Sequence, residues 1–179
     1  MDGLVVIRAR LPLVVLLALA VQTSLLDRIR IVGVAPDLML LLAVAAGVAG
    51  GPERGAVAGF LSGIAIDLFL QTPVGLSALV FSLVGYVVGM IGEGVLRSAW
   101  WIPLTTALVA TAAGVVLFAM AGAVVGESQL MRPHLVAVAA VAGVLNAVLA
   151  PLALRLTRWA VLGGSGTPAP GVRGGAFAR

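Results

Sequence analysis

The apolar positions of the chain fall into six runs that are separated by short polar or glycine-rich breaks. The runs cover residues 11–26, 36–50, 55–70, 74–92, 102–125 and 134–154. A helix that crosses the hydrocarbon layer needs roughly 20 apolar residues, and the first three runs are shorter. Flanking arginines can snorkel, and Pro36 and Asp37 can lie in the headgroup layer, which lengthens the spans. The pattern predicts an all-α, polytopic membrane helix bundle with about six transmembrane helices.

The breaks between the runs carry residues that start or stop helices. In "VAPDL", Pro36 and Asp37 suit a helix start, where the acid meets the positive end of the helix dipole. The segment "GGPERG" at 50–55 predicts a surface turn between the two helices of a hairpin. In "QTPVG", Thr72 is the predicted N-cap of the next helix and Pro73 its first position.

The composition indicates that the solvent of these helices is a membrane. Of the 179 residues, 61% are hydrophobic and 10% are charged, whereas about a quarter of an ordinary soluble domain is charged. A soluble protein of this length would need more polar residues to cover its surface. The chain contains no cysteine, which excludes disulfides, thiolate nucleophiles and thiolate metal sites.

The basic residues predict how the bundle is oriented. All eleven are arginines, and six crossings would place eight of them on the side that holds both termini. The other side has only Arg28, Arg30 and Arg132. Because cytoplasmic loops carry the excess of basic residues, we expect an inner-membrane protein with both termini in the cytoplasm. The arginines form no long basic stripe with interleaved aromatic residues, so nucleic acid is not an expected partner.

An alternative with five crossings would fuse residues 36–70 into one long helix. That helix would place Pro52, Glu53 and Arg54 near the middle of the bilayer. Each charge there costs about 2.5–3.5 kcal/mol even on the lenient insertion scale. The arrangement with six helices is therefore preferred.

The two ends of the chain need their own interpretation. Arg8 and Arg10 precede the first apolar run, so a cleaved secretory signal peptide is one alternative. An uncleaved first helix is simpler, because the candidate cleavage site, with its small residues, lies inside the apolar run and has no polar segment before it. Residues 163–179 are rich in glycine and proline and are expected to form a disordered cytoplasmic tail. The predicted domains are thus a six-helix transmembrane domain at 1–162 and this tail.

Glycines spaced four residues apart mark one face of the third run, and the fourth run carries a similar pair. These glycines are Gly55, Gly59, Gly63, Gly85 and Gly89. Glycines at this spacing let a second helix approach closely in lipid. Close packing within one bundle is the preferred interpretation, and a seam for a partner or a second copy is the alternative.

Asp67 continues the glycine face near the outer end of the third helix, so we expect it to point into the bundle. An intramembrane acid is a functional candidate by default. The preferred interpretation is a buried structural tie or interface residue, neutral or paired with Arg28 or Arg30; the alternative is a proton or ligand site. Asn146, in the middle of the last run, is expected to make an interhelical hydrogen bond.

The chain offers little for catalysis or metal binding. His134 is the single histidine, and no carboxylate or second histidine stands three or four residues away, so a metal site is unsupported. Ser62 lacks the preceding glycine that a nucleophile elbow requires. Asp37 and Asp67 could meet at the outer surface, but without the sequence context of an aspartyl protease. No catalytic residue, metal or cofactor is therefore assigned.

Several motifs between residues 36 and 91 form a characteristic set. They are P-D at 36–37, a glycine-proline turn at 51–55, G-F-x-x-G-x-x-x-D at 59–67, P-V-G-L-S-A-L at 73–79 and V-G-Y at 84–86. Across about a third of the chain, these residues resemble the rod shape-determining protein MreD family. One departure is "QTPVGL", where many relatives insert extra residues before the P-x-G.

The resemblance implies a component of the bacterial elongation machinery that maintains cell shape and supports peptidoglycan synthesis. Such a component acts without chemistry of its own in the inner membrane. The implied partners are membrane lipid, MreC, MreB, a SEDS glycosyltransferase and a penicillin-binding transpeptidase. It further implies that Asp37, Asp67 and the glycine face contact partner helices or hold an outer surface.

The fold also looks similar to the six-helix substrate-binding subunits of energy-coupling-factor (ECF) vitamin transporters. Those subunits usually show an alanine pair four residues apart on the first helix, which Ala18 and Ala20 do not supply. A vitamin-binding subunit would have an outward-opening pocket and a retained small molecule. A scaffold would instead co-purify with MreC.

Overall fold

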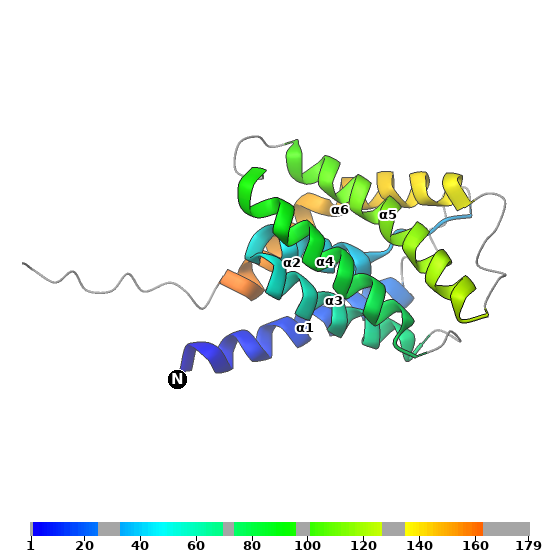
Figure 1. Cartoon of the computed structure of the whole chain (residues 1–179). Coiled ribbons are helices and arrows are strands. Elements are labelled where there is room, and N and C mark those ends of the chain that lie inside the picture. The colour runs from blue at the N-terminus through cyan, green and yellow to red at the C-terminus, as the bar shows by residue number, and fades with distance from the viewer. Residues whose placement is uncertain (1, 25–32, 70–73, 96–100, 127–134, 163–179) are drawn as a thin grey trace, which may run out of the picture.

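The computed structural model describes residues 2–24, 33–69, 74–95, 101–126 and 135–162. Within these ranges the chain forms a bundle of six helices (Figure 1). They are α1 (Asp2–Ser24), α2 (Leu38–Gly50), α3 (Pro52–Asp67), α4 (Leu76–Val95), α5 (Ile102–Val124) and α6 (Leu135–Leu162). This confirms the predicted all-α bundle. The predicted tail lies outside the described residues.

The helices differ in how well they match the thickness of a bilayer. By length and composition, α5 and α6 are able to cross a membrane, whereas α1, α2 and α4 contain shorter apolar stretches. At 13 residues, α2 is about 20 Å long, which is less than the roughly 30 Å of the hydrocarbon core. The short helices therefore depend on packing against neighbouring helices for their place in the bundle.

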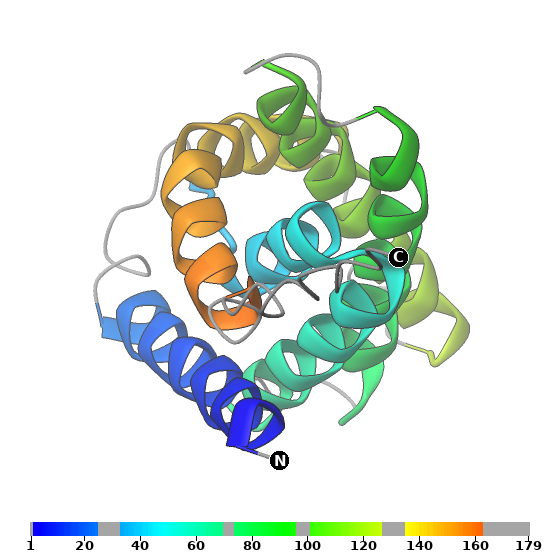
Figure 2. The same cartoon turned by 90° about the vertical axis from the view of Figure 1, so that its left-hand side faces the viewer.

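α2 is the central helix of the bundle. Its residues from Met39 to Gly47 are all buried, and it packs against each of the other five helices. Figure 2 looks at one end of the bundle and shows the other helices arranged around α2. A helix that is apolar on every side is suited to such complete burial. The core of the protein is therefore built around α2.

α2 and α3 form a hairpin that turns at a single residue. α2 ends at Gly50 and α3 begins at Pro52, so Gly51 alone joins them. Gly51 has φ 84° and ψ −177°, a conformation that is essentially open only to glycine. The turn predicted at 50–55 is thus wrong in length, because its two charged residues already belong to the first turn of α3. The side-by-side packing of α2 and α3 also contradicts the single long helix of the five-crossing alternative.

Two helices extend beyond their apolar runs. α1 begins at Asp2 and continues through Pro12, and α6 continues through Pro151 to Leu162. The apolar runs at 11–26 and 134–154 therefore give the lipid-suited part of each helix and not the full helix. Hydrophobicity marks the part of a helix that can lie in lipid, whereas the helix itself continues into its polar, arginine-bearing ends.

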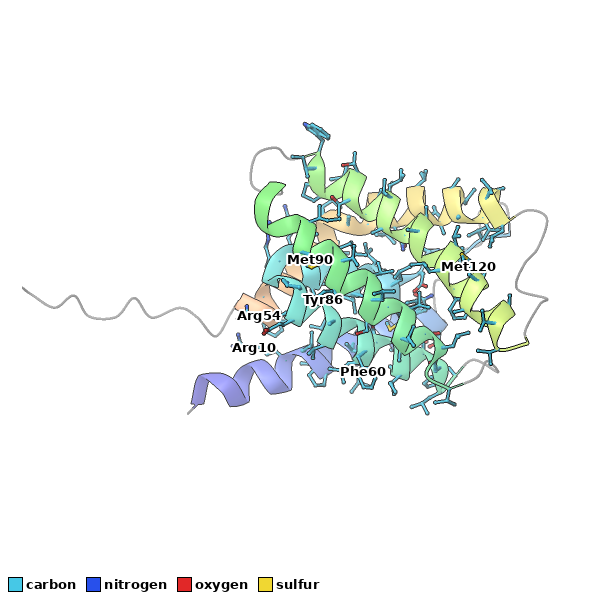
Figure 3. All side chains as sticks on the ribbon, viewed as in Figure 1. Arg10, Arg54, Phe60, Tyr86, Met90 and Met120 are labelled. Atoms are coloured by element: carbon cyan, nitrogen blue, oxygen red, sulfur yellow. The ribbon has the colours of Figure 1, made fainter. Side chains whose placement is uncertain are left out.

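The start of α1, the turn between α2 and α3, the start of α5 and the end of α6 lie at one end of the bundle (Figure 1). The Arg10 guanidinium lies over the ring of Trp159, 4.9 Å from its centroid, in the geometry of a cation–π contact. Arg54 lies at the same end, as Figure 3 shows. We refer to this end of the bundle as the basic end. The alternation of helix directions is the one expected for six crossings.

Candidate functional site: buried polar ties and a glycine seam

Asp37 stands at the start of α2, inside the bundle. Its carboxylate accepts a hydrogen bond from the backbone N–H of Leu40 at 3.0 Å, which makes it the N-cap of α2. This confirms the predicted helix start. The backbone N–H of Asp37 is bonded to Asn146, near the middle of α6. The start of α2 therefore lies against the middle of α6.

Two side-chain amides hold the backbone around this helix start. Asn146 of α6 accepts from the N–H of Asp37 at 3.0 Å and donates to its carbonyl at 2.9 Å. Gln22 of α1 accepts from the N–H of Leu38 at 2.8 Å and donates to the carbonyl of Pro36 at 3.1 Å. Backbone groups at a helix start need such external partners. We call Gln22 and Asn146, together with the backbone of 36–38, the amide clasp.

Thr111 of α5 extends the amide clasp. Asn146 Nδ2 also donates to Thr111 Oγ1 at 3.2 Å, and both side chains are completely buried. The predicted interhelical hydrogen bond of Asn146 is thus confirmed. The roles of Gln22 and Thr111 were not predicted from the sequence. Their signal is a polar residue within an apolar run, but which partners they reach depends on the packing of distant segments.

Asp67 is the last residue of α3, and its side chain is only 1% exposed. Its carboxylate accepts hydrogen bonds from the N–H of Gly75 at 2.8 Å and of Ser77 at 3.3 Å. These two residues flank Leu76, where α4 begins. Asp67 therefore caps the start of α4 from the preceding helix, where a carboxylate also meets the positive end of the helix dipole.

This arrangement changes the predicted start of the fourth helix. α4 begins at Leu76, three residues after its predicted first position. Thr72 and Pro73, the predicted N-cap and first residue, lie outside the described residues, as do Arg28 and Arg30, the predicted alternative partners of Asp67. The carboxylates of Asp37 and Asp67 serve different helix starts and have no hydrogen-bond partner in common.

α3 and α4 meet along the five glycines of the predicted face, which we call the glycine seam. Gly55 lies against the backbone of Gly85, and Gly59 against that of Phe81. Gly63 meets Ala78 in the same way, and Gly89 meets the start of α3. A Cβ atom at any of these positions would overlap backbone atoms of the other helix, so only glycine allows this approach. The glycine faces are therefore turned toward each other within one chain.

The remaining polar groups of the bundle also serve packing. Ser62 is buried and donates to the carbonyl of Gly59 at 3.2 Å. Among the described buried side-chain atoms, Ser77 Oγ is the one without a partner. Within the same part of the chain, no group of three His, Asp or Glu side chains could hold a metal ion. His134 lies outside it.

Replacing Asn146 with leucine should lower the stability of the protein by about 1–3 kcal/mol. The change leaves the N–H of Asp37 and the hydroxyl of Thr111 without their partner. Gln22→Leu should act in the same direction. Thermal unfolding of the purified protein in detergent measures the effect. The matched control is Thr23→Val, because Thr23 is exposed and its hydroxyl bonds only to its own helix. Equal stability of Asn146→Leu and the control would contradict the role of the clasp.

Gly59→Ala should destabilise the bundle by about 1–3 kcal/mol, because its methyl group would push the backbone of Phe81 and α4 away. Gly59→Leu should prevent folding. The neighbouring control is Phe60→Leu, since Phe60 is 52% exposed. The yield of monodisperse protein and its unfolding temperature are the readouts. A Gly59→Leu protein with wild-type stability would show that the seam does not hold the bundle.

Comparison with known proteins gives a match over most of the chain. A family model described as rod shape-determining protein MreD matches residues 5–158. No curated protein and no solved structure matches the chain. The matched range contains the amide clasp, Asp67 and the whole glycine seam. Because the match spans most of the 179 residues, the chain belongs to the MreD family of rod shape-determining proteins.

Proposed function

We propose that this protein is a non-enzymatic scaffold of the bacterial elongation machinery and acts in peptidoglycan synthesis along the cylindrical wall. Its proposed partners are MreC, MreB, a SEDS glycosyltransferase and a penicillin-binding transpeptidase. The observation that carries the proposal is the family match over residues 5–158. Membership of this family supports a role in determining rod shape, in a membrane, as a structural component.

The use of the buried acids favours a structural role. Asp37 and Asp67 accept hydrogen bonds from backbone N–H groups at the starts of α2 and α4. A carboxylate that is occupied in this way positions a helix and is poorly placed to exchange a proton with a substrate. A scaffold needs fixed helix positions so that its partners meet a constant surface. We therefore assign both acids to positioning of helices.

The outer surface of α4 and α5 supports contact with lipid and with partner helices. Two open cavities of about 460 and 450 Å³ lie between these helices. Both have apolar walls, and Thr105 and Thr106 are the polar side chains that line the second cavity. Small-molecule sites usually combine an apolar wall with several convergent polar groups. These cavities thus fit hydrocarbon better than a polar vitamin, the ligand of the alternative transporter subunit.

The basic end supports an orientation with both termini in the cytoplasm. Arg10 and Arg54 lie there (Figure 3), Arg155 and Arg158 belong to the last turns of α6, which ends there, and cytoplasmic ends hold the excess of arginine. Alkaline phosphatase fused after residue 53 or 160 should therefore be inactive, and green fluorescent protein at the same sites should fluoresce. A fusion after residue 130 should give the opposite result and serves as the control. Phosphatase activity after residue 160 would overturn the proposed orientation.

The scaffold proposal predicts that MreC co-purifies with the tagged, full-length chain from solubilised membranes. An unrelated polytopic membrane protein with the same tag is the control. Mass spectrometry of the same unheated sample tests for a retained small molecule. Stoichiometric vitamin without MreC would overturn the scaffold proposal in favour of a transporter subunit. Variants of the glycine seam are unsuited to this test, because they would lose partners by unfolding.

A further inference from the structure

We propose that the groove between α1 and α6 is a binding site for one anionic phospholipid. An acyl chain would lie in the groove, and the phosphate would bind Arg10 and Arg155 at the basic end. This inference goes beyond the proposed scaffold role and does not rest on it. It rests on three features of the described residues, which are the shape of the groove, the cations at its mouth and the charge of that end.

The groove is narrow and apolar, and it opens toward the outside of the bundle. Its two walls are formed by Val14, Leu17 and Val21 of α1 and by Leu149, Leu152 and Leu156 of α6, with α2 as its floor. Leu17 and Leu152 are 58% and 59% exposed. The cavity measures about 170 Å³, below the roughly 300–1,000 Å³ of compact small-molecule sites. Its form suits a single hydrocarbon chain.

The mouth of the groove carries a cation and an amphipathic aromatic ring. Arg10 lies one helical turn before Val14, and Trp159 lies about one turn after Leu156, so both stand at the basic end of the groove. They touch, with the guanidinium 4.9 Å from the ring centroid. Figure 2 views the bundle from this end, where α1 and α6 lie side by side. Tryptophan at such a place is typical of the headgroup layer.

Arg155 adds a second cation next to the ring. It precedes Trp159 by one turn, so the two side chains are neighbours on α6, and it is exposed. Guanidinium groups bind phosphate through paired, charge-assisted hydrogen bonds. The stack on Trp159 holds Arg10 in place in advance, which lowers the entropy that is lost on binding. Arg10 thus stands at the mouth of the groove, and Arg155 lies beside the ring that Arg10 contacts.

The charge of the basic end selects an anionic lipid over a zwitterionic one. Among the side chains described there, four are arginines, Arg10, Arg54, Arg155 and Arg158, and the acid is Glu53. A phosphatidylglycerol headgroup brings a net negative charge to these cations, whereas phosphatidylcholine also brings a positive group. The apolar groove alone would accept the chain of either lipid. The arginines at its mouth therefore provide the discrimination.

Native mass spectrometry of the purified full-length protein tests this site, with phosphatidylglycerol and phosphatidylcholine of identical acyl chains as probes. Phosphatidylglycerol should be retained preferentially. In Arg10→Gln/Arg155→Gln its retention should fall about tenfold or more, because two charge-assisted contacts are lost. Arg10→Gln alone removes one charge and should also lower the retention of phosphatidylglycerol, and its matched control is Arg158→Gln. The control removes one charge as well, but position 158 faces roughly opposite Leu156 on α6 and away from the groove.

Two further variants separate the groove from the charge. Ala18→Phe fills the groove at a lining position without altering an arginine, and it should reduce retention of phosphatidylglycerol. Arg10→Lys keeps the charge but loses the planar guanidinium fork. Its retention of phosphatidylglycerol should therefore lie between that of the wild type and that of the double variant. Thermal unfolding identifies the folded variants, and if Ala18→Phe does not fold, the charge variants decide. Equal retention of both lipids by wild type, or an equal loss in Arg158→Gln, would overturn the proposal.

Discussion

The structure depends on how the backbone N–H and C=O groups at the start of α2 find hydrogen-bond partners within the bundle. In lipid, each exposed backbone N–H or C=O without a partner costs several kcal/mol, so a helix that begins away from water needs partners from its neighbours. Asp37 caps the first turn, while Gln22 and Asn146 take up the backbone of 36–38. Each amide both donates and accepts. This pairing lets a short helix of 13 residues serve as the core, and it joins α1 and α6 to that core.

A second constraint joins the α2–α3 hairpin to α4. The glycine seam brings two backbones closer than any side chain would permit, which gains dispersion contacts where lipid removes the hydrophobic drive between helices. Asp67 then closes the end of this contact by binding the first N–H groups of α4. The seam and the carboxylate act on the same helix pair. Together they hold α3 against α4, while Gly51 provides the tight turn between α2 and α3.

The amide clasp and the carboxylates of Asp37 and Asp67 thus hold helices from within the bundle, whereas the features open to other molecules lie on the outside. These are the apolar cavities between α4 and α5 and the groove between α1 and α6, with arginines at the basic end. Such a division of roles is consistent with a family that determines cell shape as a structural component. A fixed interior keeps the outward surfaces constant for lipid and for proteins in the same membrane.

The sequence by itself determined the membrane class, the number of helices, the helix start at Pro36 and Asp37, the hydrogen bonding of Asn146 and the spacing of the glycine face. These follow from composition, from the period of the helix and from short-range rules for helix starts. Only the tertiary structure decided that Gln22 reaches Pro36 and Leu38, that Asp67 caps α4, and that the turn needs Gly51 alone. It also showed that α1 and α6 continue past their apolar runs. The reason is physical. The period of a sequence pattern is a local property, whereas the hydrogen-bond partner of a side chain is set by packing between segments far apart in the chain.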